Sequence, residues 1–411
     1  MVAKINADTS GGLKITSDTS GTLEIQSAGT TKFTVNSAGV DIPAIGTING
    51  LTSINGGQVG GRRNIFYNGE MKVAQRSTSE TGLGAADGYF TIDRCNMNVG
   101  AASAGRFTMA QIADGPAGFA NCMKLTTTTA DTSIAAGEYL LFKQSFEGQD
   151  VQQLKKGTAS AEQVTVSFYV KGNAAALYVC EVSDNDNSRT IQQSFAVTTS
   201  WNRIELTFAA DTSDPLDDDN GSSLSLNIWL HAGSDYTSGT FAVNTWADNV
   251  TANRAAVDGF TSIYDSTDRT FFLTGVQMEI GSTATDFESR SYGEELALCQ
   301  RYYYKNKADT TNSTFGSGFI DTTTIAYSVL SFPVSMRDAP SALEQTGTAS
   351  NYRLRIGSGA NVTCNSVPAF IGSSTDSAWT QFFVASGLTA GQGALARANS
   401  TAAFLAWSAE L

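Results

Sequence analysis

Residues that catalytic sites commonly use are scarce in this sequence. The 411 residues include a single histidine, so a histidine metal cluster is excluded and a Ser-His-Asp triad nearly so. No GxSxG, HExxH, phosphate-loop or dinucleotide-binding motif occurs. His231 lies in the strand-like LNIWLHAG, where we expect it to be a residue of a sheet. The sequence therefore predicts a protein that is not an enzyme.

Cysteine, proline and charged residues are also few. The five cysteines lie far apart without a CxxC pair, which is typical of small buried side chains in a chain folded under reducing conditions; one Cys–Cys pairing stays open. Only 16% of residues are charged, and 39 glycines stand against 6 prolines. This composition favours short strands and tight turns over long helices.

The sequence has no apolar run of about 18 residues, and no apolar stretch follows Met1. We therefore expect a protein made in the cytoplasm without a signal peptide and without membrane insertion. The net charge of −13 is concentrated in residues 63–292, which carry 15 basic and 27 acidic side chains, a difference of −12. Such an acidic region argues against nucleic acid and anionic lipid as partners.

A ten-residue repeat marks the N-terminal part, where DTSG at 8–11 returns at 18–21 and SAG at 27–29 returns at 37–39. Short alternating pieces, Leu13–Ile15, Leu23–Ile25 and Phe33–Val35, lie between these turns. So small a ribbon cannot bury enough apolar area alone, which favours an oligomer; a flexible tail is the alternative. In 41–62 an apolar residue recurs every three positions, which suits either a trimeric stalk or a simple linker.

The middle of the chain, residues 63–292, contains strand-like pieces separated by polar turns. They span 122–129, 139–146, 164–172, 176–182, 201–210, 224–233 and 271–280. This series predicts an antiparallel jelly-roll sandwich. In the last piece the apolar alternation breaks at Gly275, where a β-bulge would restore it.

A short helix is expected after the last of these strands, within residues 293–305, with Ser291 as its N-cap. We expect Leu296, Cys299 and Tyr303 to face a threefold axis there. Residues 306–411 again read as short strands, at 324–334, 352–359, 366–372, 380–387 and 402–409, and predict a small C-terminal β-sandwich. The predicted fold class is all-β, with 1–62 as the repeat region and stalk.

Several segments resemble bacteriophage tail-fibre and virion appendage proteins, especially those of marine and cyanobacterial phages. They are NIFYNGEMKVAQRSTS, GYFTIDR, FFLTGVQMEIGSTATDFESRSYGEELALCQRYY and FPVSMRDAPS, besides the DTSGG repeat. The resemblance implies a homotrimeric fibre whose N-terminal region attaches to other virion proteins. It also implies a middle domain like carbohydrate-binding modules, with NIFYNGEM beside TGVQMEI, and a C-terminal head that faces the host.

Aromatic side chains are the natural contacts for sugar rings, whose C–H faces stack on them. In the middle domain we expect Tyr236 and Trp246, in polar loop sequence, and Trp201 to bind a ligand; Tyr327 and Trp379 are the candidates in the C-terminal domain. For each of these residues, packing in the core is the alternative.

Acidic residues offer two further possibilities. Asp217, Asp218 and Asp219 could hold Ca²⁺ through their carboxylates, although the spacing is not that of an EF-hand, and a solvated turn is the alternative. A pair of carboxylates in the middle domain could also hydrolyse a glycan.

The sequence thus predicts a virion fibre protein that adheres to host-surface polysaccharide. The alternatives are a glycan depolymerase on the fibre and a purely structural connector or head decoration protein.

Overall fold

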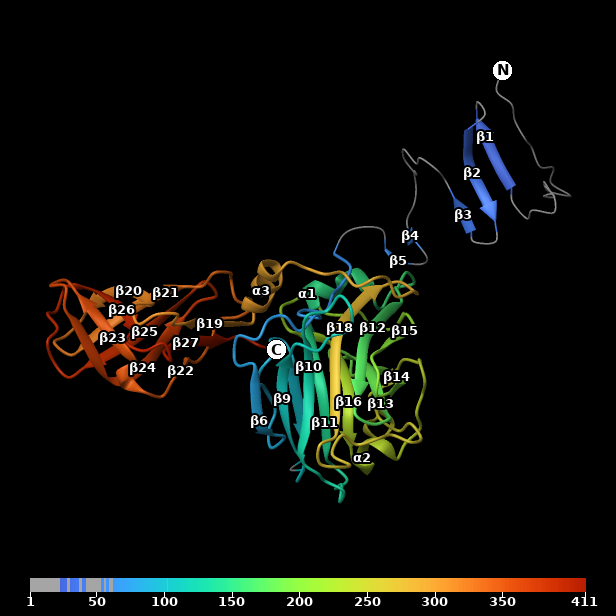
Figure 1. The fold of residues 1–411 in the computed structure, drawn as a ribbon, viewed down its shortest axis with the longest axis horizontal. Coiled ribbons are helices and arrows are strands. Elements are labelled where there is room, and N and C mark those ends of the chain that lie inside the picture. The colour runs from blue at the N-terminus through green and yellow to red at the C-terminus, as the bar shows by residue number, and fades with distance from the viewer. Residues whose placement is uncertain are drawn as a thin grey trace. The chain divides into compact units, whose positions relative to one another are not determined.

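The computed structural model describes residues 23–27, 30–36, 39–41, 53–54, 57–58, 62–101 and 103–411. Its chain divides into two compact units, Met1–Ile54 and Asn55–Leu411. In the first unit, β1 (Leu23–Ser27), β2 (Thr30–Asn36) and β3 (Gly39–Asp41) form an antiparallel sheet (Figure 1). Two further short strands are β4 (Ser53–Ile54) and β5 (Gly57–Gln58).

Two of the three strand pieces predicted in the repeat are therefore present, and the register pairs Leu23 with Val35 and Ile25 with Phe33. The third piece, 13–15, and most of the three-residue pattern in 41–62 lie outside the described residues.

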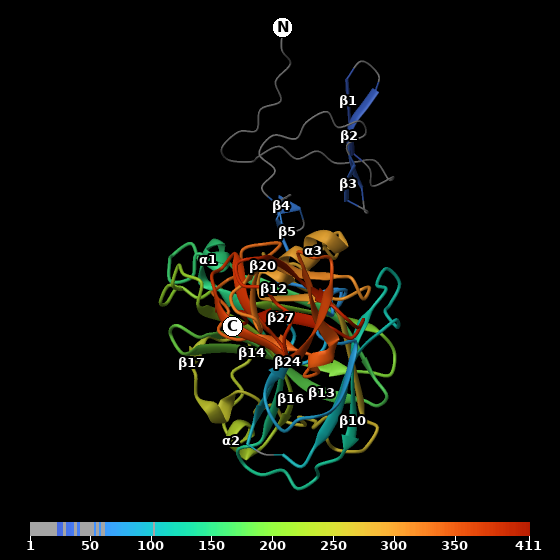
Figure 2. The same ribbon diagram turned by 90° about the vertical axis from the view of Figure 1, so that its left-hand side faces the viewer.

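The second unit begins with a sandwich of two antiparallel sheets, seen from two sides in Figures 1 and 2. One sheet has the order β15-β12-β18-β10-β9-β6. Its strands are β6 (Ser79–Leu83), β9 (Arg106–Ile112), β10 (Cys122–Thr129), β12 (Val164–Gly172), β15 (Asn202–Phe208) and β18 (Thr270–Ile280).

The opposing sheet has the order β17-β14-β13-β16-β11-β8-β7. Its strands are β7 (Gly88–Tyr89), β8 (Asn96–Gly100), β11 (Tyr139–Glu147), β13 (Ala176–Asp184), β14 (Arg189–Val197), β16 (Ser222–Ala232) and β17 (Ala247–Asp248). Short helical turns α1 (Gly148–Val151), 152–154, α2 (Ser234–Thr237) and 251–253 lie in its connections. The large apolar side chains of both sheets form one continuous core between them.

The sandwich confirms several details that the sequence predicts. Gly275 adopts φ +63° at an irregularity in the pairing of β18 with β12, so it forms the expected bulge. A Cβ there would lie 2.8 Å from the Phe119 ring, which leaves no room for a larger residue. The first segment does lie beside the last strand, because Ile65 N donates to Met278 O at 2.8 Å.

The helix α3 (Tyr292–Gln300) follows the sandwich, and Ser291 caps it as expected: its Oγ accepts from Glu294 N while Glu294 binds back to Ser291 N. The expected threefold-axis face is wrong for Cys299 and Tyr303. Both are buried within their own chain, because this segment packs against the sandwich and carries the chain into the next strand.

The C-terminal part is all-β as predicted, but it is a closed barrel with a small sheet and not a small β-sandwich. The barrel has the order β20-β21-β25-β24-β23-β26, and the small sheet has the order β19-β27-β22. A 3-10 turn at 349–351 precedes β23. The strands are β19 (Tyr303–Lys307), β20 (Thr314–Ile320), β21 (Ile325–Ser331), β22 (Glu344–Gln345), β23 (Tyr352–Ile356), β24 (Asn361–Ser373), β25 (Ser377–Val384), β26 (Gly393–Ala398) and β27 (Phe404–Ser408).

The difference comes from β20 and β26, whose glycine- and alanine-rich sequences, TFGSGFI and GALARA, give no strand signal. These two strands pair with each other and close the sheet on itself, which removes its edges. Without β20 and β26, the predicted strands would form an open sheet.

A buried polar joint connects the barrel part to the sandwich. Arg94 is fully buried, forms an ion pair with Glu410 and lies 3.5 Å from the centroid of the Tyr302 ring. Tyr302 in turn donates to Glu147 Oε1 at 2.6 Å, and Arg301 Nε donates to the same oxygen at 2.7 Å. A buried cation held by both a carboxylate and a ring face fixes how the two parts meet.

All five cysteines are free and buried, which confirms their predicted role as small apolar side chains. No helix among the described residues is both long and apolar enough to cross a membrane.

Candidate functional site

A groove of about 340 Å³ lies over the outer face of the sheet that contains β11, β13 and β16. It exists because the long connection between β16 and β18 folds back over this face and brings α2 and the turn at 251–253 with it. The groove is lined by Asn98, Tyr139, Leu141, Lys143, Ser183, Asp184, Asn185, Ser188, Ser225, Asn227, Tyr236, Asn249, Thr251 and Arg254.

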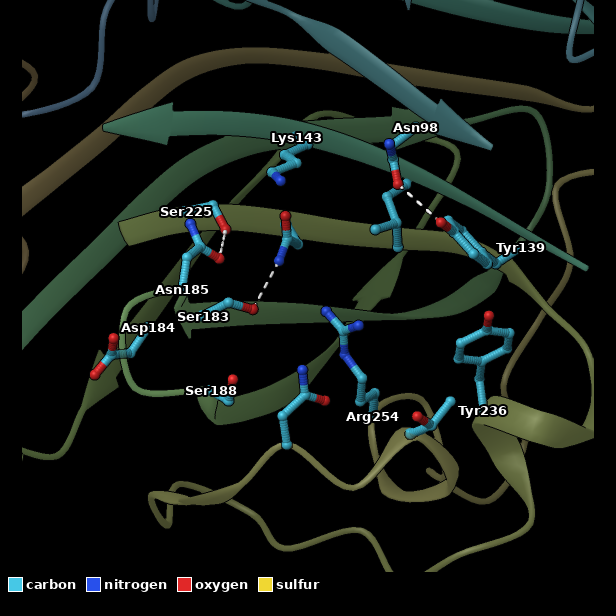
Figure 3. A pocket seen from close by; sticks show the side chains of 14 residues that line it. Asn98, Tyr139, Lys143, Ser183, Asp184, Asn185, Ser188, Ser225, Tyr236 and Arg254 are labelled. Atoms are coloured by element: carbon cyan, nitrogen blue, oxygen red, sulfur yellow. Dashed lines mark hydrogen bonds between the residues drawn. The ribbon is translucent and has the colours of Figure 1, made fainter. Parts of the chain in front are cut away.

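Two tyrosine rings, Tyr139 and Tyr236, lie at one end of the groove (Figure 3), and both pack on Trp229. The Tyr236 ring centroid lies 5.0 Å from that of Tyr139 and 5.3 Å from that of Trp229. Trp229 is fully buried, whereas Tyr139 and Tyr236 are half-buried and line the groove. The tyrosines therefore present ring surface and hydroxyl groups to a ligand, supported from below by the tryptophan.

Amide and hydroxyl groups line the opposite end, where Figure 3 shows Ser183, Asn185, Ser188 and Ser225. Asn185 Oδ1 accepts from Ser225 Oγ at 3.4 Å. These groups both donate and accept hydrogen bonds, as a ligand rich in hydroxyl groups requires.

Between the two ends, Arg254 lines the groove and forms an ion pair with the buried Glu181. Arg254 Nε donates to Glu181 Oε2 at 2.9 Å, and Ser183 Oγ and Asn227 Nδ2 also donate to this carboxylate. Burial opposes ionisation of Glu181, but Arg254 and these hydrogen bonds outweigh it and hold its pKa below the usual value. Glu181 is therefore a fixed anion that orients Arg254, and it is not poised as a general acid.

Lys143 lies in the middle of the groove on β11, opposite Asn227 in the register. Burial lowers its pKa, and the nearby Arg254 guanidinium lowers it further. Glu181 and Asp87 act in the opposite sense and only partly offset this.

Of the five aromatic residues predicted from the sequence, only Tyr236 lines the groove. Trp246 is half-buried and donates from Nε1 to Ala209 O at 2.8 Å, so it acts as a packing anchor beside Lys156. Trp201 lies on the opposite sheet, next to Lys171.

Tyr327 and Trp379 lie together on the outside of the barrel, with ring centroids 6.1 Å apart. They belong to a different surface from the groove, whose lining includes neither of them.

The sequence did not reveal Tyr139, Lys143, Asn227 and Arg254 as site residues. Tyr139, Lys143 and Asn227 sit at alternate positions of strands whose apolar residues dominate the pattern, and Arg254 lies in a loop far along the chain. The polar residues at 143 and 227, inside otherwise apolar strands, were the available signal.

The other candidates are packing or surface residues. His231 is buried in β16, where Nδ1 lies 2.7 Å from Ser262 Oγ, and it is a sheet residue as expected. Asp217, Asp218 and Asp219 are exposed. No group of three His, Cys, Asp or Glu side chains within the described ranges is arranged to hold a metal, and Ca²⁺ at this loop stays a prediction.

No family model matches this sequence, and no curated protein matches it. Among solved structures, the family 11 carbohydrate-binding module of a cellulosomal cellulase of Clostridium thermocellum shares 13% identity, covering 51% of this chain and 98% of the module, with a TM-score of 0.25. A second similar structure, a putative sugar binding protein from Bacteroides thetaiotaomicron, has 11% identity, coverage of 53% and 100%, and a TM-score of 0.27.

A third, TmCBM61 in complex with β-1,4-galactotriose, has 9% identity, coverage of 53% and 99%, and a TM-score of 0.26. At these identities and TM-scores, the similarity does not identify a ligand of this chain. The ligand is therefore inferred from the residues that line the groove.

Proposed function

We propose that this chain is a virion fibre or appendage protein that attaches a phage particle to host-surface polysaccharide through the groove. The observation that carries the proposal is the composition of the groove. Paired tyrosine rings at one end and a row of amides and hydroxyls at the other are the contacts that a sugar chain needs. That the chain belongs to a phage particle and binds a host surface is proposed from the resemblance of its sequence segments to phage fibre proteins.

Binding is favoured over hydrolysis by the state of the carboxylates in the groove. Glu181 is saturated by Arg254, Ser183 and Asn227, and Asp184 contacts Lys156 at 2.5 Å. A glycosidase needs one carboxyl group that can donate a proton and a second that can attack or activate water. Carboxylates held in this way serve neither role well.

The test is to incubate the purified chain with host polysaccharide and measure both retention and chain length. We expect retention without shortening, and Tyr236→Ala should weaken binding about tenfold because one of the two rings that line the groove is removed. Tyr264→Phe, which alters a buried tyrosine on the other side of this sheet, is the matched control and should bind normally. Shortened chains would support the depolymerase alternative, and no retention would support the connector.

We also propose that the chain assembles as a homotrimer. The outer face of the barrel supports this, because it exposes large apolar side chains. They are Phe319, Tyr327, Val329, Ile371, Trp379 and Leu395, of which all but Tyr327 are between 38% and 47% exposed.

The register makes this face continuous: Val329 pairs with Trp379, and Ser317 pairs with both Val329 and Leu395. No Asp, Glu, Lys or Arg occurs in β20, β21 or β25. Side chains close to a threefold axis meet their own copies, so strands without charged residues suit self-association there in a chain of net charge −13.

Sedimentation should give a mass near three times 43.3 kDa. Val329→Lys should shift the protein toward smaller species, while Asn365→Lys, which adds the same charge at an exposed position of β24, should not. A monomeric wild-type chain would contradict the trimer.

A further inference from the structure

Given the proposed glycan-binding role of the groove, we infer that its ligand is an anionic glycan whose carboxylate or sulfate group binds Lys143. Lys143 has no partner among the described residues. It lines the groove and is only partly exposed, yet its ammonium forms no ion pair and no hydrogen bond with any residue that the structure describes. A partly desolvated ammonium without a partner has three donors available to a ligand.

The other charges around the groove are already engaged. Arg254 is held by Glu181, and Asp184 is held by Lys156 and by the amide of Asn187. Asp87 faces the same region, but its carboxylate accepts from Asn98 Nδ2 and from the backbone N of Val99. Each of these groups has a partner within the chain, whereas Lys143 has none among the described residues.

Asn227 supplies a second, independent observation. It is 2% exposed, lines the groove and pairs with Lys143 across the strands. Its Nδ2 donates to Glu181, but its Oδ1 is buried without a hydrogen bond in the described structure. An acceptor left unsatisfied at the floor of a groove costs free energy until a ligand hydroxyl donates to it.

The two groups together specify the chemistry of one sugar unit. An acidic substituent would bind Lys143, and a neighbouring hydroxyl would donate to Asn227. A neutral sugar would cover Lys143 and remove its water without supplying a counterion, which is unfavourable. The depressed pKa of Lys143 agrees with this, since an anion placed there would offset the effect of burial and of Arg254.

The experiment measures binding of the full chain to matched oligosaccharides by calorimetry. One arm compares oligogalacturonate with its carboxyl-reduced neutral form, and a second compares a sulfated galactan oligosaccharide with its desulfated form. We expect roughly ten- to hundredfold tighter binding of the carboxylated or the sulfated member of its pair, as charged hydrogen bonds provide. The arm that shows the difference identifies the anion.

Lys143→Gln should abolish that preference while leaving affinity for the neutral forms within about twofold, and Lys143→Arg should restore much of it. Lys124→Gln is the matched control, because it removes the same charge from a strand of the opposite sheet. Equal binding of charged and neutral members, or a preference that survives Lys143→Gln, would overturn the inference while the proposed function stands. If no oligosaccharide of either pair binds to the wild type or to the variants, the inference about the anion and the proposed glycan binding are both contradicted.

Discussion

The sandwich and the barrel are both built from antiparallel strands, but only the barrel closes on itself, and the two regions fill their cores differently. The sandwich places its large residues, such as Phe168 and Phe271, between the sheets. The barrel places alanines inside at 326, 378, 394, 396 and 398, while larger residues such as Trp379 and Leu395 lie outside. The interior of a six-stranded barrel is narrow, so small side chains fill part of it and bulkier ones are displaced outward. Alternation along the barrel strands therefore buries small residues together with Phe382, and leaves Trp379 and Leu395 on the outer face.

The sandwich and the barrel also differ in net charge and in the polarity of their surfaces. Residues 63–292 carry a net charge of −12, whereas 306–411 carry five basic and six acidic side chains. The sandwich carries a polar groove, and the barrel exposes an apolar face whose strands β20, β21 and β25 contain no charged residue. The polar groove and the apolar face therefore lie in separate regions of the chain.

The largest effect is expected at the joint between the two regions. Arg94→Met leaves Glu410 buried with one fewer cation, so the free energy of unfolding should fall by about 3–5 kcal/mol. Denaturant unfolding followed by tryptophan fluorescence would measure this. Lys155→Met, which breaks an exposed ion pair with Glu162, should change it by less than about 1 kcal/mol. Equal effects of the two variants would mean that the joint does not stabilise the molecule.

The contrast in packing predicts opposite outcomes at neighbouring positions of β26. Ala396 points into the barrel and Leu395 points out, so Ala396→Leu should overpack the interior and cost about 1–3 kcal/mol. Leu395→Ala should change the unfolding free energy of the isolated chain by about 0.5 kcal/mol or less. Thermal unfolding of Ala396→Leu and Leu395→Ala, at a protein concentration too low for assembly, would measure both changes. A larger loss for Leu395→Ala would contradict the inside-outside assignment.

The joint also predicts a specific pH dependence. Burial raises the pKa of Asp93 from 3.8 to about 6, and its hydrogen bonds to Gln75 and the charge of Arg76 only partly oppose this. The folded state therefore binds the proton more tightly than the unfolded state, so the stabilisation is complete below pH 3.8 and is lost as the pH rises through about 6.

The melting temperature of the wild type should therefore rise when the pH is lowered from 7 to 5, because Asp93 takes up a proton in the folded state. Asp93→Asn, which is neutral throughout, should show a smaller gain over the same interval. Calorimetric scans of both proteins at the two pH values test this. An unchanged gain in the variant would assign the pH dependence to other groups.

The smallest effect concerns the acidic loop of the sandwich. Asp217, Asp218 and Asp219 are exposed, so Asp218→Asn should change stability by less than about 0.5 kcal/mol. If the loop binds Ca²⁺, adding the ion should raise the melting temperature of the wild type and not of Asp218→Asn. A titration of both proteins with CaCl₂ decides between a bound ion and a solvated turn.

Much of the sandwich was predictable because its strands carry strong local signals. The predicted pieces at 122–129 and 164–172 coincide with β10 and β12, and the bulge at Gly275 follows from a single break in alternation. The strand β14, with the polar sequence RTIQQSFAV, was missed because burial is imposed by its neighbours and not by its own composition. Closure of the barrel was missed for the same reason at β20 and β26.

The sequence by itself determined the all-β class, the N-cap of the helix at Ser291 and the burial of the cysteines, because each depends on residues close together in the chain or on composition. Only the tertiary structure decided the groove. Its residues come from three segments of the chain: Tyr139, Lys143, Asn227, Tyr236 and Arg254. The pairing of β11 with β16 and the loop that follows β16 bring these segments together. Long-range pairing places side chains on a common face, and that information is not contained in any one segment.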